Sequence, residues 1–119
     1  MIEVTYHMPE PGGTYSLTVT GHAEYEDDGF DAVCASISTL IYTLAQNIKD
    51  ADGLGYLRRH PTLKLEDGDA RVKARPLLEK EALIAMMFTV VVRGVELIAK
   101  NYPLHVCLVK MVPVATPTK

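Results

Sequence analysis

Two residues near the start of the chain have the types and the spacing for nucleophilic catalysis. His22 and Cys34 lie in the stretch GHAEYEDDGFDAVCASIS at 21–38. A cysteine thiolate attacks carbonyl carbon when an imidazole within about 3 Å accepts the thiol proton and later protonates the leaving group. Free cysteine is also among the most buried residue types, so an inert structural Cys34 is the alternative. A histidine at a strand end is often a surface or structural residue, so His22 is either the catalytic base or such a residue.

The position of Cys34 in the first turn of a predicted helix favours a reactive thiol. Apolar residues recur with a helical period over 33–48, and Asp31 is a suitable N-cap for that helix. Ala32 is then the first helical residue and Cys34 the third. Unpaired amides and the positive end of the helix dipole lower the pKa of a cysteine in a first turn.

The neighbouring residues keep two interpretations each. Asp31 caps the helix or orients His22 as the third group of a triad. Ser38 lies one turn beyond the cysteine and bonds either near the site or to its own helix. Gly21 and Gly29 bracket the connecting segment and either let it move over a substrate or form plain turns.

Four carboxylates crowd the same segment, at Glu24, Glu26, Asp27 and Asp28. They form a solvated loop or, if they flank a site, favour a basic substrate. The net charge of −3 argues against a dedicated nucleic-acid binder, so no direct contact with nucleic acid is expected.

Composition predicts one soluble globular domain over residues 1–119, with 48% apolar and 23% charged residues. No secretory signal is expected at the N-terminus. The apolar run at 82–92 has 11 residues, against the roughly 20 of a membrane span, so no membrane partner is expected. The histidines and the two cysteines lack metal-ligand spacing, which predicts no metal and no cofactor. These features predict a cytoplasmic protein with reduced thiols.

Hydrophobic periodicity predicts an α+β domain of order ββαββαβ, with one antiparallel or mixed sheet of about five strands. The predicted strands are 2–7, 14–21, 62–66, 70–74 and 104–112. The predicted helices run from 32 to the glycine-rich stretch at 49–55, and over 77–100. Asp67-Gly68 joins the third and fourth strands as a hairpin, and 114–119 is a tail.

The second predicted helix is apolar on most sides, with two separate stripes. One stripe is Ile84, Met87, Phe88, Val91, Val95 and Ile98, and the other is Leu83, Met86, Val90 and Leu97. The sheet can cover one of them. Either the first helix or a second subunit covers the other, and this favours a homodimer.

The combined pattern resembles the ribosomal-processing cysteine proteases, the Prp family of small bacterial proteins. The resemblance rests on Gly21-His22-Ala23, Gly29, Asp31, Val33-Cys34-Ala35 and Ser38. It extends over nearly the whole chain in length and element order.

The resemblance implies a homodimeric cysteine endopeptidase that cleaves the N-terminal extension from large-subunit ribosomal protein twenty-seven. It implies a dyad of Cys34 as nucleophile and His22 as base, with Asp31 and Ser38 in supporting positions. Gly21, Ala23 and Gly29 would belong to a substrate loop whose acidic residues face a basic substrate.

Two rival functions stay open. One is a non-catalytic ribosome-assembly or peptide-binding module with a structural Cys34. The other is a thiol redox sensor, which requires Cys107 near Cys34 as a resolving partner. Cys107 lies inside a predicted strand and is expected in the core.

Overall fold

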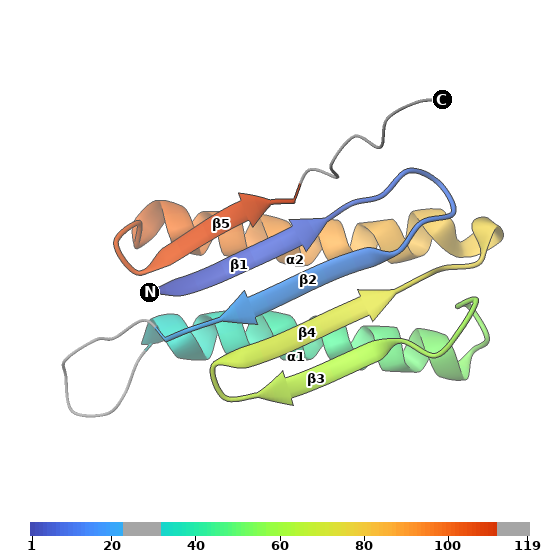
Figure 1. Ribbon diagram of the computed structural model, residues 1–119, viewed down its shortest axis with the longest axis horizontal. Helices are drawn as coiled ribbons and strands as arrows, with labels where there is room; N and C mark the ends of the chain where they lie inside the picture. Colours follow the sequence, from blue (N-terminus) through green and yellow to red (C-terminus); the bar gives the residue numbers. More distant parts are fainter. Residues whose placement is uncertain (23–31, 112–119) are drawn as a thin grey trace, which may run out of the picture.

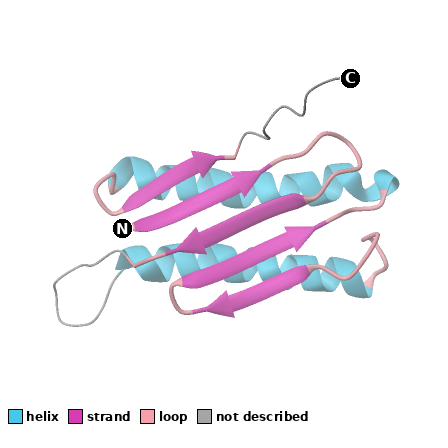
Figure 2. Cartoon of the chain, viewed as in Figure 1, coloured by secondary structure: helices cyan, strands magenta, loops and turns pink. Residues whose placement is uncertain are grey.

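The computed structural model describes residues 1–22 and 32–111, which form one sheet and two helices in two layers. The strands are β1 (Ile2–His7), β2 (Tyr15–Thr20), β3 (Thr62–Glu66), β4 (Asp69–Ala74) and β5 (Val106–Lys110). The helices are α1 (Ala32–Gly53) and α2 (Glu81–Asn101), with a short 3-10 turn, η1 (Leu78–Lys80), before α2. Both helices cover the same face of the sheet (Figure 1), and Figure 2 shows the two element types as separate layers. The predicted α+β class and ββαββαβ order are confirmed.

The strand order β3-β4-β2-β1-β5 decides which segments meet at the ends of the sheet. β1–β2, β2–β4 and β3–β4 pair antiparallel, whereas β1 and β5 pair parallel, so the sheet is mixed. Because β4 lies beside β2, with Thr20 opposite Asp69, the β3–β4 turn lies beside the residues that follow β2.

The core lies between the sheet and the helices and follows the predicted periods. Val4, Leu17 and Val72 point towards the helices from three neighbouring strands and are fully buried. Each such side chain contributes about 1.5–3 kcal/mol by leaving water. The buried residues of α1 are Val33, Ile37, Ile41, Leu44, Ala45, Ile48 and Ala51.

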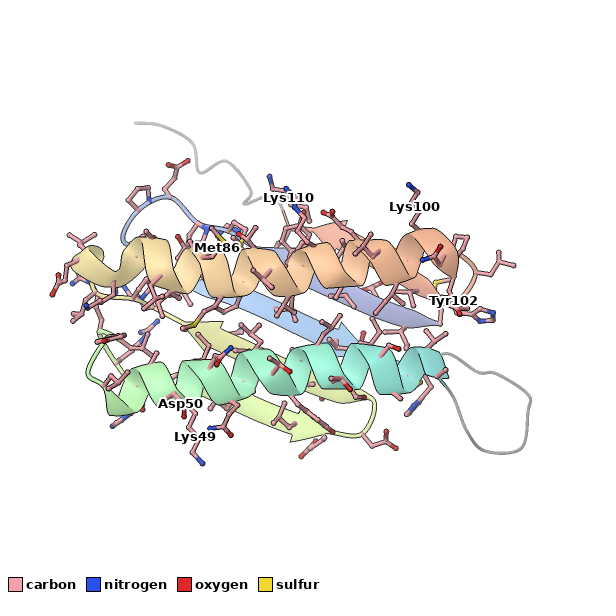
Figure 3. The ribbon with its side chains drawn as sticks, turned by 180° about the vertical axis from the view of Figure 1, so that it is seen from behind. Lys49, Asp50, Met86, Lys100, Tyr102 and Lys110 are labelled. Atoms are coloured by element: carbon pink, nitrogen blue, oxygen red, sulfur yellow. The ribbon has the colours of Figure 1, made fainter. Side chains whose placement is uncertain are left out.

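Close packing sets α1 beside α2. A Cβ at Gly94 of α2 would lie 2.9 Å from a methyl carbon of Leu40 on α1, which is closer than real Cβ contacts. The missing side chain at position 94 therefore allows the helices to approach, and Figure 3 shows them side by side in front of the sheet.

The second helix begins later than predicted, at Glu81 instead of 77. The Leu77 amide donates to the Tyr56 carbonyl at 2.9 Å, which keeps residue 77 extended. The hydroxyl of buried Tyr15 donates to Glu81 Oε2 at 2.6 Å, and the Gly12 amide donates to Oε1 at 3.1 Å. Burial and the Glu81 carboxylate raise the pKa of Tyr15 well above its usual value. These bonds tie the β1–β2 loop to the start of α2.

Three strands are shorter or longer than predicted by one or two residues at their ends. The predicted 14–21 is Tyr15–Thr20, 70–74 is Asp69–Ala74, and 104–112 is Val106–Lys110. The last strand pairs with β1 from Ile2 opposite Val106 to Tyr6 opposite Lys110. The predicted tail at 114–119 and residue 112 lie outside the described residues.

The second predicted apolar stripe of α2 lies on the face that points away from the core and is exposed. Leu83, Met86, Val90 and Leu97 are 44%, 59%, 60% and 64% exposed, and Met86 is labelled in Figure 3. By length and composition alone, the helical stretch Leu78–Asn101 is apolar enough to cross a membrane. The unbroken apolar run at 82–92 is shorter than a membrane span, so it did not indicate this. The opposite face of α2 packs into the core of this fold through Ile84, Phe88, Val91, Val92 and Val95.

Candidate active site

The first turn of α1 holds the candidate nucleophile. The helix begins at Ala32, as predicted, so that Cys34 is its third residue. The Cys34 side chain is half-buried and packs against the core on the sheet side of the helix. The amides of a first helical turn and the positive dipole end stabilise a thiolate over a thiol.

His22 follows the last residues of β2, where a glycine lets the chain leave the sheet. Gly21 has φ +87°, and a Cβ at this position would overlap the carbonyl oxygen of Met1. The Gly21 amide donates to the Gly68 carbonyl at 3.0 Å, which fixes the backbone before His22 to the β3–β4 turn. The backbone before His22 is therefore fixed by one hydrogen bond and lies close against Met1.

The His22 imidazole lies directly over Gly68. A Cβ built on Gly68 would be 2.7 Å from Nε2 and 3.1 Å from Cε1 of the ring. The other ring nitrogen, Nδ1, is 3.9 Å from Oδ1 of Asp67, too long for a hydrogen bond. The sequence identified Asp67-Gly68 only as a hairpin turn, and its relation to His22 was missed.

One small cavity brings the predicted site residues together. Gly21, His22, Cys34 and Ser38 all line a hollow of about 60 Å³, together with Gly68 of the β3–β4 turn. That volume accommodates a few water molecules or one small side chain. The cavity lies between the end of β2, the first three turns of α1 and the β3–β4 turn.

Carboxylates surround the mouth of this cavity, at Glu66, Asp67 and Asp69. Lys64 Nζ lies 2.7 Å from Asp69 and 3.5 Å from Glu66, and its hydrogen bond holds the pKa of Asp69 below the usual value. Asp67 is 99% exposed beside His22. Because Lys64 and Arg71 offset much of the charge of Asp69 and Glu66, the exposed Asp67 carboxylate is the group at the rim that would favour a basic ligand.

Several predicted residues cannot be placed. Ala23, Gly29 and Asp31 lie outside the described residues, as do the four carboxylates of the same segment. The capping and triad interpretations of Asp31 therefore both stay predictions, and so does the substrate-loop role of Gly29. In the described ranges 1–22 and 32–111, no group of three or more His, Cys, Asp or Glu side chains could hold a metal ion.

The expectation that Cys107 is a core residue is wrong. Val106, its neighbour in β5, is buried, and Cys107 lies opposite Glu3 on the face of the sheet away from the helices. Cys34 packs on the helix side, so the sheet separates the two thiols. The redox interpretation requires Cys107 near Cys34, and their placement on opposite faces of the sheet argues against it.

The sequence matches a known protein family. A family model described as cysteine protease Prp matches residues 1–107. No curated protein matches the sequence.

Solved structures share the fold. A ribosomal processing protease Prp from S. aureus, in complex with a covalently linked product peptide, has a TM-score of 0.68 at 19% identity, covering 93% of this chain and 100% of its own. The same protein with a substrate peptide has a TM-score of 0.64 at 19% identity, with the same coverage. SMU.848 from Streptococcus mutans has a TM-score of 0.61 at 26% identity, covering 93% of this chain and 94% of its own.

Proposed function

The chain belongs to the Prp family of cysteine proteases, and from this premise we propose that it removes the N-terminal extension of large-subunit ribosomal protein twenty-seven during ribosome maturation. One observation carries the proposal: His22 and Cys34 line the same small cavity at the first turn of α1. The S. aureus relative is described as a ribosomal processing protease and holds a covalently linked product peptide. Since ribosomes mature in the cytoplasm, we expect the protein to act there.

The proposed mechanism uses a dyad. The Cys34 thiolate attacks the peptide carbonyl, the C–N bond breaks, and His22 protonates the leaving amine. Water, deprotonated by His22, then attacks the thioester and releases the second product with Cys34 restored. Amides at the start of α1 are the natural donors to the oxyanion, and each such donor typically contributes about 3 kcal/mol to the barrier reduction.

We assign supporting roles to the remaining motif residues. Asp31 caps α1 and orients His22, and Ser38 hydrogen-bonds within the cavity that it lines. Gly21, Ala23 and Gly29 belong to the segment that contacts substrate. The exposed Asp67 carboxylate at the cavity mouth supports a basic substrate, as ribosomal proteins are.

The test is direct cleavage of the extended ribosomal protein. The purified wild-type chain should shorten the precursor at one bond, which intact-mass measurement and N-terminal sequencing would locate. The mature protein, without the extension, is the control and should stay unchanged. A precursor that keeps its full mass after prolonged incubation contradicts the proposed substrate.

A non-catalytic assembly or peptide-binding module is the second candidate. The observation in its favour is the partial burial of Cys34 against the core, which is typical of structural cysteines. In that case a Cys34→Ala chain supports ribosome maturation in cells as well as the wild type does.

We also propose that the chain forms a homodimer through the exposed apolar stripe of α2, defined above by Leu83, Met86, Val90 and Leu97. Light scattering should give twice the 13.1 kDa chain mass. Val90→Asp would place a charge in that interface and should yield monomers. Thr43→Asp, on the exposed face of α1, is the matched control. A wild-type monomer at micromolar concentration contradicts the proposal.

A further inference from the structure

A second hollow, here called the α1–β3 groove, lies beside the candidate active site. It has a volume of about 640 Å³ and is lined by α1 residues from Tyr42 to Asp52, by His60 and Pro61, and by Leu63 and Leu65 of β3. Its polar lining includes Lys49 and the hydrogen-bonded pair of Asp52 and His60. Its volume is within the range of sites that hold several side chains of a ligand.

The two leucines of the groove are apolar residues that the fold leaves uncovered. Across β4, Leu63 pairs with Val72 and Leu65 with Ala70, so all four point to the helix-covered side of the sheet. Val72 and Ala70 are 0% and 6% exposed, but Leu63 and Leu65 are 37% and 44% exposed. α1 packs over β4 and stops short of the edge strand β3.

The groove adjoins the candidate active site. Tyr42, which is half-exposed, lines both the small cavity with Cys34 and the groove. β3 runs from the far end of the groove to the Asp67-Gly68 turn under His22 (Figure 1). A peptide that leaves the cavity along α1 therefore passes Tyr42 and then reaches the groove.

Helix geometry gives the distance of the groove from the reacting bond. Tyr42 and Lys49 are 8 and 15 residues beyond Cys34, which at about 1.5 Å per residue is about 12 Å and 22 Å. An extended peptide advances about 3.3 Å per residue, so these points lie about four and seven residues from the scissile bond.

We propose that the α1–β3 groove is a substrate subsite that binds apolar side chains about four to seven residues from the scissile bond. The inference rests on the proposed peptidase function. β3 is an edge strand whose outer main-chain groups can pair with an extended peptide. Alternate side chains of such a peptide would fall on Leu63 and Leu65, so the substrate should be apolar at every second position there.

The test compares two synthetic peptides from the extended ribosomal protein. The long peptide keeps eight residues on each side of the cleaved bond, and the short one keeps three, too few to reach the groove. For each chain we divide kcat/KM for the long peptide by kcat/KM for the short peptide. We expect Leu65→Gln to lower this ratio about tenfold. Leu78→Gln, an exposed leucine on η1, is the matched control and should leave the ratio unchanged. An unchanged ratio in Leu65→Gln overturns the subsite.

A binding measurement separates this proposal from the proposed function. The labelled long peptide should bind the Cys34→Ala chain, followed by fluorescence anisotropy, and Leu65→Gln in that background should weaken binding about tenfold. Equal affinity with and without Leu65→Gln, or no binding, overturns the subsite. Groove-dependent binding without cleavage by the wild type leaves the subsite intact and overturns the peptidase function. A change of molar mass in Leu65→Gln would identify a second copy of the chain as the occupant.

Discussion

Replacing Cys34 with alanine is expected to lower the rate of precursor cleavage by more than about 10³-fold, because the covalent intermediate can no longer form. The fold should survive, since the half-buried thiol is exchanged for a smaller apolar group at the edge of the core. The rate is measured from the mass of the released extension. Circular dichroism and thermal unfolding check that the variant is folded.

Cys107→Ala is the matched control, because Cys107 lies on the opposite face of the sheet and should be dispensable for cleavage. Wild-type cleavage by Cys34→Ala would show that Cys34 is not the nucleophile. Equal losses in both variants would point to a structural effect.

The pairing of Cys34 with His22 has a test that needs no substrate. Iodoacetamide should alkylate Cys34 well below pH 8, because a neighbouring imidazole stabilises the thiolate. His22→Ala should remove this low-pH reactivity, with Cys107 as the internal standard. Peptide mass mapping gives the rate at each thiol. If Cys34 reacts as an ordinary thiol in both chains, no dyad is formed in the free protein.

The fold could be predicted from sequence because its signals are local. The strands alternate with period two, and α1 follows a helical period from Val33 to Ile48 as expected. The same alternation, applied to Val106-Cys107-Leu108, would have placed Cys107 on the open face. The second helix was predicted too early because its start is decided by the distant bonds of Leu77 and Glu81.

The part of the site that was missed depends on strand order, which no local pattern gives. The β3–β4 turn reaches His22 only because β4 pairs with β2, with Thr20 opposite Asp69. Had β3 been the neighbour of β2, Gly68 would lie elsewhere and the Asp-Gly signal would look the same. Sequence therefore predicted the turn residues and could not predict that they support the histidine.

This contact makes Gly68→Ala the second large expected effect. The new Cβ would lie 2.7 Å from Nε2 of His22, whereas ordinary contacts begin at 3.4 Å, so the ring must move by about 0.7 Å (3.4 − 2.7). The backbone before His22 is held by the Gly21–Gly68 hydrogen bond, so the side chain has to rotate. A misplacement of about 1 Å in a catalytic group costs about 10²-fold, so this smaller shift should lower the rate by about tenfold or more. The cleavage rate and the low-pH alkylation of Cys34 should fall together.

Gly55→Ala separates the loss of the contact from backbone strain. Gly55 has φ +77° and Gly68 has φ +74°, but a Cβ at Gly55 meets nothing within 4 Å. An alanine in this left-handed region costs about 1–2 kcal/mol of stability at either position. The two variants should therefore unfold at similar temperatures, while only Gly68→Ala loses cleavage and low-pH alkylation. If both variants keep wild-type alkylation of Cys34, Gly68 does not position His22. If both lose cleavage equally, strain and not displacement of the imidazole is the cause.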